Sequence, residues 1–275
     1  MGTFVNFIAG MNRYTIPGVN PEAILVNVPQ NAGTESQIRE TMKLFHEIQP
    51  RVTMVDSGGY QLLSRELKGA KAEYDGSKPM LYSKDRVNLA PPHIIQAVVK
   101  LNPDFCTSLD LPVVKVKEVY EQKLDFMRKL GSNLVWMREC ALLRMRHCPN
   151  INFFIPVQCY DLNQFMSYIE PILMALPFDG LSLPTRNVGP AGVTLFFIRF
   201  HQLGVRKVHL LSVANFTELA LAAYFARNVF DWCSVDATTW RLAADNQRYL
   251  DPNDLHHISV GDNAGFRDAE RPSCD

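Results

Sequence analysis

The sequence predicts a single-domain (β/α)8 barrel, and three observations support this fold class. The chain has 275 residues, close to the roughly 250 that such a barrel needs. Short apolar runs alternate along the chain with segments of helical periodicity, which is typical of a parallel sheet covered by helices. About eight apolar runs occur, a number that fits a closed barrel better than an open sheet. We place the barrel at residues 1–250 and a C-terminal tail, with little periodicity, at residues 251–275.

The predicted elements follow in order from local patterns. Strands are expected where apolar and β-branched residues run together, at residues 4–9, 23–28, 52–55, 104–109, 151–157, 180–183, 208–213 and 232–235. Helices are expected where apolar residues recur at helical spacing, over residues 35–48, 91–101, 115–131, 132–146, 162–176, 191–203 and 216–226. Thr34 can cap the first helix, and Pro91 can start the second. Residues 69–84, rich in Gly, Lys and Tyr, are expected to form a loop.

Composition narrows the class of protein. Hydrophobic residues make up 47% of the chain and charged residues 20%, which is ordinary for a globular protein. No apolar run approaches the ~18 residues of a membrane span, and no signal peptide is evident, so we expect a cytoplasmic protein. The net charge of zero argues against a strongly basic nucleic-acid binder but allows a local basic patch. The six cysteines form no CxxC or CxC pair, so we expect neither a zinc site nor a disulfide framework. We also predict no other metal and no cofactor.

Polar side chains fall where apolar runs end. Asp56, Asp110, Gln158 and Asp236 each follow or close such a run. In a (β/α)8 barrel these positions share the C-terminal face, where catalytic groups gather. Each acid, taken singly, could instead cap the following helix. Three acids and an amide at four strand ends favour a site, in which neighbouring carboxylates would have perturbed pKa values.

The stretch after the third strand, Asp56-Ser57-Gly58-Gly59-Tyr60-Gln61, is the most informative. The two glycines allow a sharp turn and close approach of a flat ligand to the main chain. Carboxylate, hydroxyl and amide groups can hydrogen-bond a polar heterocycle, and the tyrosine ring can cover its face. The alternative interpretation is a polar strand-to-helix turn without chemistry.

This stretch resembles the DSGGFQ motif of the tRNA-guanine transglycosylase superfamily, with Tyr60 in place of Phe. Other segments resemble family motifs in the same order: residues 108–112 the LDxP segment, 156–159 the VQGG segment, 178–181 the GGL turn, 208–214 the HLFGAG or YLMGVG strand, and 234–250 the archaeal segment FDSxxYxLYAxDxRYL. Cys159, Tyr160, Ser212 and Ala214 replace glycines of these motifs. The family's CxCxxC…H zinc-binding set is absent, and there is no room for the RNA-binding C-terminal domains of archaeal members.

The resemblance implies roles for individual residues. Asp236 would be the nucleophile. Asp231 is a less favoured alternative, which we consider because Phe230 and Asp231 also form an FD pair. Asp56 would be the general acid and base. The base would be bound by the remaining predicted residues, with Tyr60 and Leu211 on its two faces: Ser57, Tyr60, Asp110, Gln158, Gly180, Leu181 and Leu211.

The implied reaction replaces guanine in a polynucleotide by a free 7-deazaguanine (preQ0-type) base through a covalent glycosyl-aspartate. The compact phage and bacterial branch that the chain most resembles acts on DNA, so DNA is the expected partner, with tRNA as the alternative. A homodimer is left open, and no membrane partner is expected. Phosphates could be contacted by Lys68, Lys71, Lys78, Lys84, Arg186 and Arg241. A barrel aldolase or hydrolase for a small molecule, and a catalytically inactive partner subunit, are less favoured alternatives.

Overall fold

The computed structural model describes residues 2–9, 21–60, 73–75, 78–80, 89–113, 118–213, 215–237, 248–250 and 257–259. The chain divides into two compact units, Met1–Ala237 and Thr238–Asp275. All of the predicted site residues belong to the first unit. Two short strands of the second unit, β11 (Arg248–Leu250) and β12 (His257–Ser259), pair antiparallel with each other.

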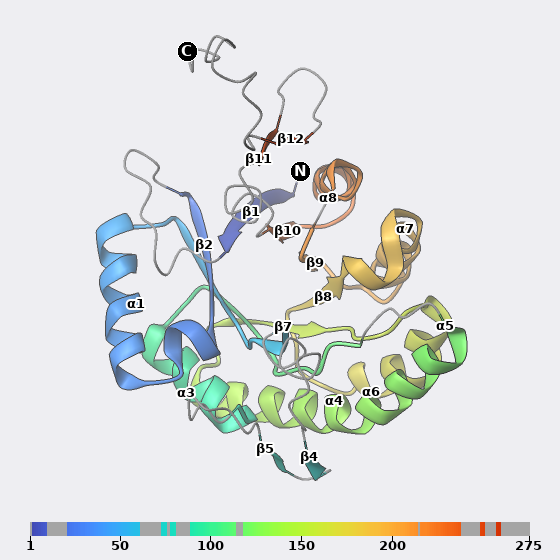
Figure 1. Cartoon of the computed structure of the whole chain (residues 1–275), viewed down its shortest axis with the longest axis horizontal. Helices are drawn as coiled ribbons and strands as arrows, with labels where there is room; N and C mark the ends of the chain where they lie inside the picture. Colours follow the sequence, from blue (N-terminus) through green and yellow to red (C-terminus); the bar gives the residue numbers. More distant parts are fainter. Residues whose placement is uncertain are drawn as a thin grey trace. The chain divides into compact units, whose positions relative to one another are not determined.

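The first unit is a closed barrel of eight parallel strands, which confirms the predicted fold class (Figure 1). Around the barrel the strands follow the order β1-β10-β9-β8-β7-β6-β3-β2, and β1 closes it by pairing with both β10 and β2. Their bounds are β1 Thr3–Ala9, β2 Ala23–Asn27, β3 Val52–Asp56, β6 Phe105–Thr107, β7 Asn152–Pro156, β8 Gly180–Pro184, β9 Lys207–Leu211 and β10 Trp232–Ala237.

From β2 to β10, helices connect the successive strands of the barrel and lie around them (Figure 1). They are α1 (Glu35–Ile48), α3 (Pro91–Leu101), α4 (Val119–His147), α5 (Leu162–Gln164), α6 (Glu170–Leu173), α7 (Thr185–Gln202) and α8 (Phe216–Asn228), with π-helical turns at Val28–Ala32 and Phe165–Ile169. The predicted starts of the first two helices are correct. Thr34 caps α1 by accepting a hydrogen bond from the backbone N–H of Gln37, and Pro91 opens α3.

The two helices predicted at residues 115–131 and 132–146 are in fact one helix, α4. Gly131 does not break it, since this residue faces open space and costs only about 1 kcal/mol relative to alanine. Buried side chains on both sides of the glycine, Phe126 before it and Trp136 after it, hold the helix against the barrel. Tertiary packing therefore outweighs the local signal for a break.

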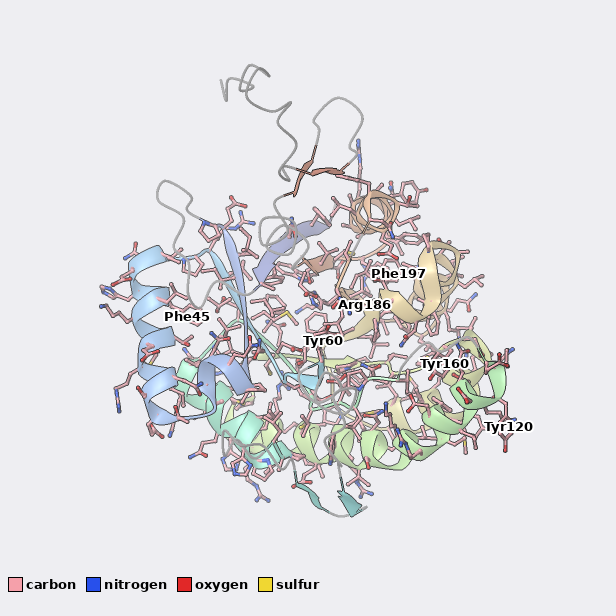
Figure 2. All side chains as sticks on the ribbon, viewed as in Figure 1. Phe45, Tyr60, Tyr120, Tyr160, Arg186 and Phe197 are labelled. Carbon is pink, nitrogen blue, oxygen red and sulfur yellow. The ribbon has the colours of Figure 1, made fainter. Side chains whose placement is uncertain are left out.

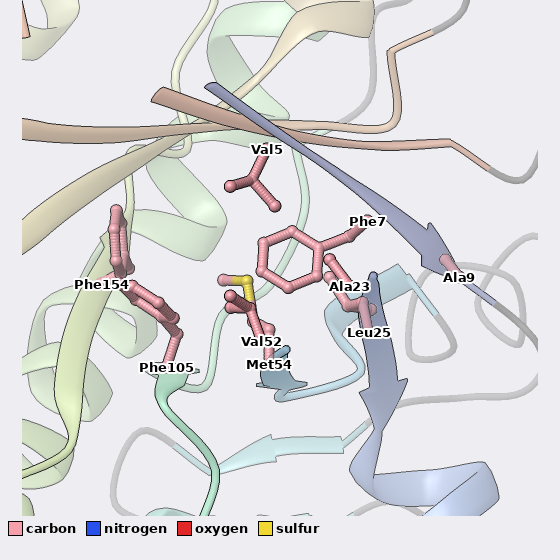
Figure 3. Packing of buried hydrophobic residues seen from close by; sticks show 9 residues of the cluster. All are labelled: Val5, Phe7, Ala9, Ala23, Leu25, Val52, Met54, Phe105 and Phe154. Carbon is pink, nitrogen blue, oxygen red and sulfur yellow. The ribbon is translucent and has the colours of Figure 1, made fainter. Parts of the chain in front are cut away.

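A cluster of buried apolar side chains from neighbouring strands packs together in the first unit (Figure 3). Its packed residues are Val5, Phe7, Ala9, Ala23, Leu25, Val52, Met54, Phe105 and Phe154. The Phe105 ring also stacks on Trp232 with ring centroids 4.5 Å apart. Because successive side chains of a strand alternate between its two faces, Asp56 faces the interior two residues beyond Met54.

Two further observations concern the other predictions. The residues predicted to form a loop at 69–84 include a short antiparallel pair, β4 (Glu73–Asp75) and β5 (Lys78–Met80). Within the described ranges, no helix has the length and apolar character needed to cross a membrane.

Candidate active site

All four polar residues predicted at strand ends lie on the C-terminal side of the barrel. Asp56 is the last residue of β3, and Asp236 lies one residue before the end of β10. Asp110 comes three residues after β6 ends, and Gln158 two residues after β7 ends. Asp110, Gln158 and Asp236 are buried, and Asp56 is partly exposed.

Asp110 is held by a hydrogen-bond network that includes two predicted partners. The Ser57 hydroxyl donates to Asp110 Oδ1 over 3.0 Å, and the Gln158 side-chain amide donates to Oδ2. The Gln158 side-chain oxygen in turn accepts from the backbone N–H of Val113 over 3.3 Å. A Cβ added to Gly59 would lie 2.4 Å from Asp110 Oδ1, so only glycine allows this loop to approach the carboxylate.

Asp56 is fixed by one side chain and one main-chain group. Thr107 donates its hydroxyl proton to Asp56 Oδ1 over 3.1 Å, and the N–H of Gly58 donates to Oδ2 over 3.0 Å. The Thr107 hydroxyl also accepts from the backbone N–H of Ser57 over 2.9 Å. Thr107 was missed in the sequence, although its place at the end of the neighbouring strand β6 was a usable signal.

Asp236 is oriented by the end of β9. The backbone N–H of Ser212 donates to Asp236 Oδ1 over 2.9 Å, and His209 Nε2 lies 3.3 Å from the same oxygen. Ser212 has φ +59°, a left-handed conformation that usually favours glycine, and it stands where the resembling motif has glycine. Neither His209 nor Ser212 was predicted to contact the nucleophile.

The rival nucleophile Asp231 lies just before β10 begins, at the opposite end of the strand from Asp236. Five residues of strand separate the two positions by about 17 Å. Asp231 is exposed and forms an ion pair with Arg206, whose guanidinium lies 2.6 Å from it and lowers its pKa. The structure thus places Asp236, not Asp231, with the other carboxylates.

The carboxylates perturb one another. Burial raises the pKa of Asp56, although part of the residue is exposed to solvent. The negative charge of Asp236 raises this pKa further. The hydrogen bonds from Gly58 and Thr107 oppose this shift. Burial, followed by the charge of Asp56, raises the pKa of Asp110 to about 7, against the hydrogen bonds from Ser57 and Gln158. Asp56 is therefore biased toward its protonated form beside Asp236.

Gly180 and Leu181 do not join this group, contrary to our expectation. They begin β8, about 13 Å (Gly180) and about 10 Å (Leu181) along the strand from its C-terminal end at Pro184. A Cβ on Gly180 would meet the Phe154 ring at 2.4 Å, so this glycine accommodates core packing. The prediction was based on a short motif match, whereas the strand continues for three residues beyond Leu181.

Tyr60 and Leu211 border the C-terminal side. Tyr60 is 51% exposed, and the Arg186 guanidinium lies 5.1 Å from its ring centroid; Figure 2 labels both residues. Leu211 ends β9, beside Pro184 of β8, on the same strand face as His209. Arg186 forms a cation–π contact with Tyr60. Its contact with phosphate stays a prediction. Of the other predicted phosphate contacts, Lys78 lies in β5, and Lys68, Lys71, Lys84 and Arg241 lie outside the described residues.

Fold and site together define a (β/α)8 barrel with three acidic side chains and an amide at the face where barrel enzymes carry out catalysis. The chain matches no model of a known protein family and is not significantly similar to any curated protein sequence. Within the described ranges, no three His, Cys, Asp or Glu side chains are grouped so that they could hold a metal ion. A separate hollow of about 190 Å³ lies beside α1 and α3 and is lined by none of these acidic residues.

The raised pKa of Asp110 predicts a pH-dependent stability difference. Asp110→Asn should show a pH-dependent gain in the free energy of unfolding, relative to the parent protein, that grows between pH 4 and pH 7. A pH-independent loss should accompany it, because the amide nitrogen cannot accept the hydrogen bond that one carboxylate oxygen accepts in the parent protein. The acid ionises near pH 4 when unfolded but only near pH 7 when folded, so the folded state is disfavoured as pH rises between these values. The gain above pH 7 has an upper limit of about 4 kcal/mol. Urea denaturation at several pH values measures it, and a difference that is constant with pH would contradict the assignment.

Proposed function

We propose that this protein is a base-exchange transglycosylase that replaces guanine in a polynucleotide, preferably DNA, with a 7-deazaguanine base of the preQ0 type. The observation that carries the proposal is the pairing of Asp56 and Asp236 at the C-terminal side of the barrel. The pKa of Asp56 is raised, which favours its protonated form, whereas Asp236 accepts a hydrogen bond from the backbone N–H of Ser212 and lies 3.3 Å from His209 Nε2. Two carboxyl groups whose environments differ in this way suit an acid and a nucleophile.

The chemistry is a double displacement. A carboxylate oxygen of Asp236 attacks C1′ of the target deoxyguanosine, or guanosine in tRNA, and the bond from C1′ to N9 breaks with its electron pair going to the base. Asp56 gives its proton to the departing guanine. In the second half, ionised Asp56 takes the N9 proton of the incoming deazaguanine, whose N9 attacks C1′ and releases Asp236.

Recognition of the base is assigned to Asp110 and Gln158. Guanine and 7-deazaguanine both present N1–H and amino donors on one edge, and a carboxylate such as that of Asp110 can accept from them. Both bases also carry the acceptor O6, to which the side-chain N–H of Gln158 can donate. Each carboxylate oxygen has two lone pairs, so Asp110 can accept from the base while keeping Ser57 and Gln158. The target base must leave its stack to reach these groups, because its glycosidic bond is otherwise shielded.

Incorporation of a labelled base tests the proposal and distinguishes exchange on DNA from the alternative, exchange on tRNA. The protein is incubated with tritiated guanine or preQ0 and, in parallel, with duplex DNA, single-stranded DNA or tRNA. Label in DNA is the expected result, and label in tRNA alone would favour the same exchange on tRNA. No label in any polynucleotide, and no release of guanine, would contradict the proposed activity. The resemblance to the compact DNA-modifying branch motivates the preference for DNA.

Tyr60→Ala should raise the KM for the free base by about tenfold, because base–aromatic stacking contributes about 1–3 kcal/mol. Folding should be unaffected, since the ring is half exposed. Tyr60→Phe should keep nearly all of the affinity, because stacking needs the ring and not the hydroxyl. The control is Tyr120→Ala on α4, a tyrosine that is 73% exposed. Steady-state exchange kinetics measure all three, and equal KM values for Tyr60→Ala and the control would remove Tyr60 from the base site.

A further inference from the structure

A row of polar side chains crosses the barrel interior one layer below Asp236. Ser182 of β8, His209 of β9 and Ser234 of β10 are register partners on three neighbouring strands. All three are buried, with at most 1% exposure. His209 also packs edge-on against Phe7 and Phe154 of the apolar core, with ring centroids 6.0 and 6.4 Å away. Burying polar groups in an apolar core is costly unless they hydrogen-bond. Ser182 Oγ has no hydrogen-bond partner among the described residues, so the hydrogen bond between His209 and Ser234 is the one whose direction matters.

The indole of Trp232 constrains the direction of the hydrogen bond between Ser234 and His209. Its N–H can only donate, and it lies 3.0 Å from the Ser234 hydroxyl oxygen. The same oxygen lies 2.9 Å from His209 Nδ1. The Ser234 hydroxyl has one proton to donate, and His209 Nδ1 is the one acceptor that it contacts among the described residues. This arrangement favours a lone pair on Nδ1 and therefore the imidazole proton on Nε2.

The His209 Nε2 atom faces Asp236. It is buried, lies 3.3 Å from Asp236 Oδ1, and has no well-aligned hydrogen-bond partner among the described residues. The opposite tautomer would point a nitrogen lone pair at the carboxylate, which is repulsive. Contacts that are long or poorly aligned in the free enzyme often tighten when substrate binds. A small rotation of the Asp236 side chain would suffice.

We propose that His209, as its Nε2–H tautomer, is a positioning residue that holds Asp236 by Oδ1 and leaves Oδ2 as the oxygen that attacks C1′. The backbone N–H of Ser212 donates to Oδ1 as well, so both donors address the same oxygen. The attacking role of Oδ2 rests on the proposed function, whereas the His209–Asp236 contact and its tautomer do not.

Two substitutions separate positioning from packing. The amide of His209→Gln can place an N–H near the former Nε2 position, whereas the shorter amide of His209→Asn mimics Nδ1 and does not reach Asp236. Formation of the covalent protein–oligonucleotide complex should slow by about tenfold to a hundredfold in His209→Asn, the effect of losing a hydrogen bond to a charged group. His209→Gln should retain most of the rate. His147→Asn, at an exposed position on α4, is the control.

The tautomer is measured independently of activity. Nitrogen-15 NMR correlations of the imidazole, assigned by their loss in His209→Gln, should show the proton on Nε2 in the parent protein. In Ser234→Ala the preference should weaken, because Nδ1 loses its donor. A proton on Nδ1 in the parent protein, or equal rates for His209→Asn and His209→Gln, would overturn the inference. If the parent protein forms no covalent complex, the proposed function fails, and the NMR result alone decides whether His209 holds Asp236.

Discussion

Asp236→Asn should abolish base exchange and leave no covalent complex with the polynucleotide. An amide has the same shape as the carboxylate but carries no charge and is a poor nucleophile at C1′. The backbone N–H of Ser212 can still donate to the Asn oxygen, so the fold of the site should survive. Binding of the polynucleotide should change little, because it depends mainly on phosphate contacts. Denaturing gel electrophoresis after incubation with an oligonucleotide, with and without deazaguanine, measures the complex.

The matched control is Asp231→Asn, a substitution of the same kind at an exposed position five residues earlier, just before β10 begins. Its covalent complex should persist, since only the surface ion pair with Arg206 is lost, and such pairs contribute about 0–1 kcal/mol. A shifted band that survives in Asp236→Asn and vanishes in Asp231→Asn would transfer the nucleophilic role to Asp231.

Asp56→Asn should slow exchange by about a hundredfold to ten-thousandfold, the usual contribution of a general acid or base. The attacking carboxylate of Asp236 remains, so the defect should lie in departure of the guanine. An oligonucleotide containing 7-methylguanine, whose base leaves without needing a proton, should recover much of the lost rate of complex formation. Single-turnover kinetics on the two oligonucleotides measure this. The same oligonucleotide should not rescue Asp236→Asn, and failure to rescue Asp56→Asn would argue against the acid role.

The pH dependence of the parent protein follows from the same residue. The pKa of Asp56 is raised, so its protonated form persists to higher pH than that of an ordinary aspartic acid. Complex formation needs this form, so its rate should fall as pH rises through the raised pKa. Complex formation with 7-methylguanine oligonucleotide should not show this fall.

Local patterns were sufficient to predict the barrel. Each inner strand is a short apolar run, and the helices show their caps and periodicity, as Thr34 and Pro91 do. The positions of Asp56 and Asp236 at strand ends could also be predicted, since alternation along a strand depends only on local sequence. Local patterns failed where packing overrode them, as at Gly131 inside α4. They also failed where a short motif match assigned Gly180 and Leu181 to the base site, although these residues begin β8.

The sequence by itself determined which side chains are available and to which end of the strands Asp56 and Asp236 belong. Tertiary structure alone decided what those side chains do to one another, because Ser57 and Gln158 reach Asp110 from 53 and 48 residues away along the chain. Burial and neighbouring charges, which raise the pKa of Asp56 and Asp110, exist only once the strands have assembled. The same is true of His209, which became a partner of Asp236 only when β9 was placed beside β10.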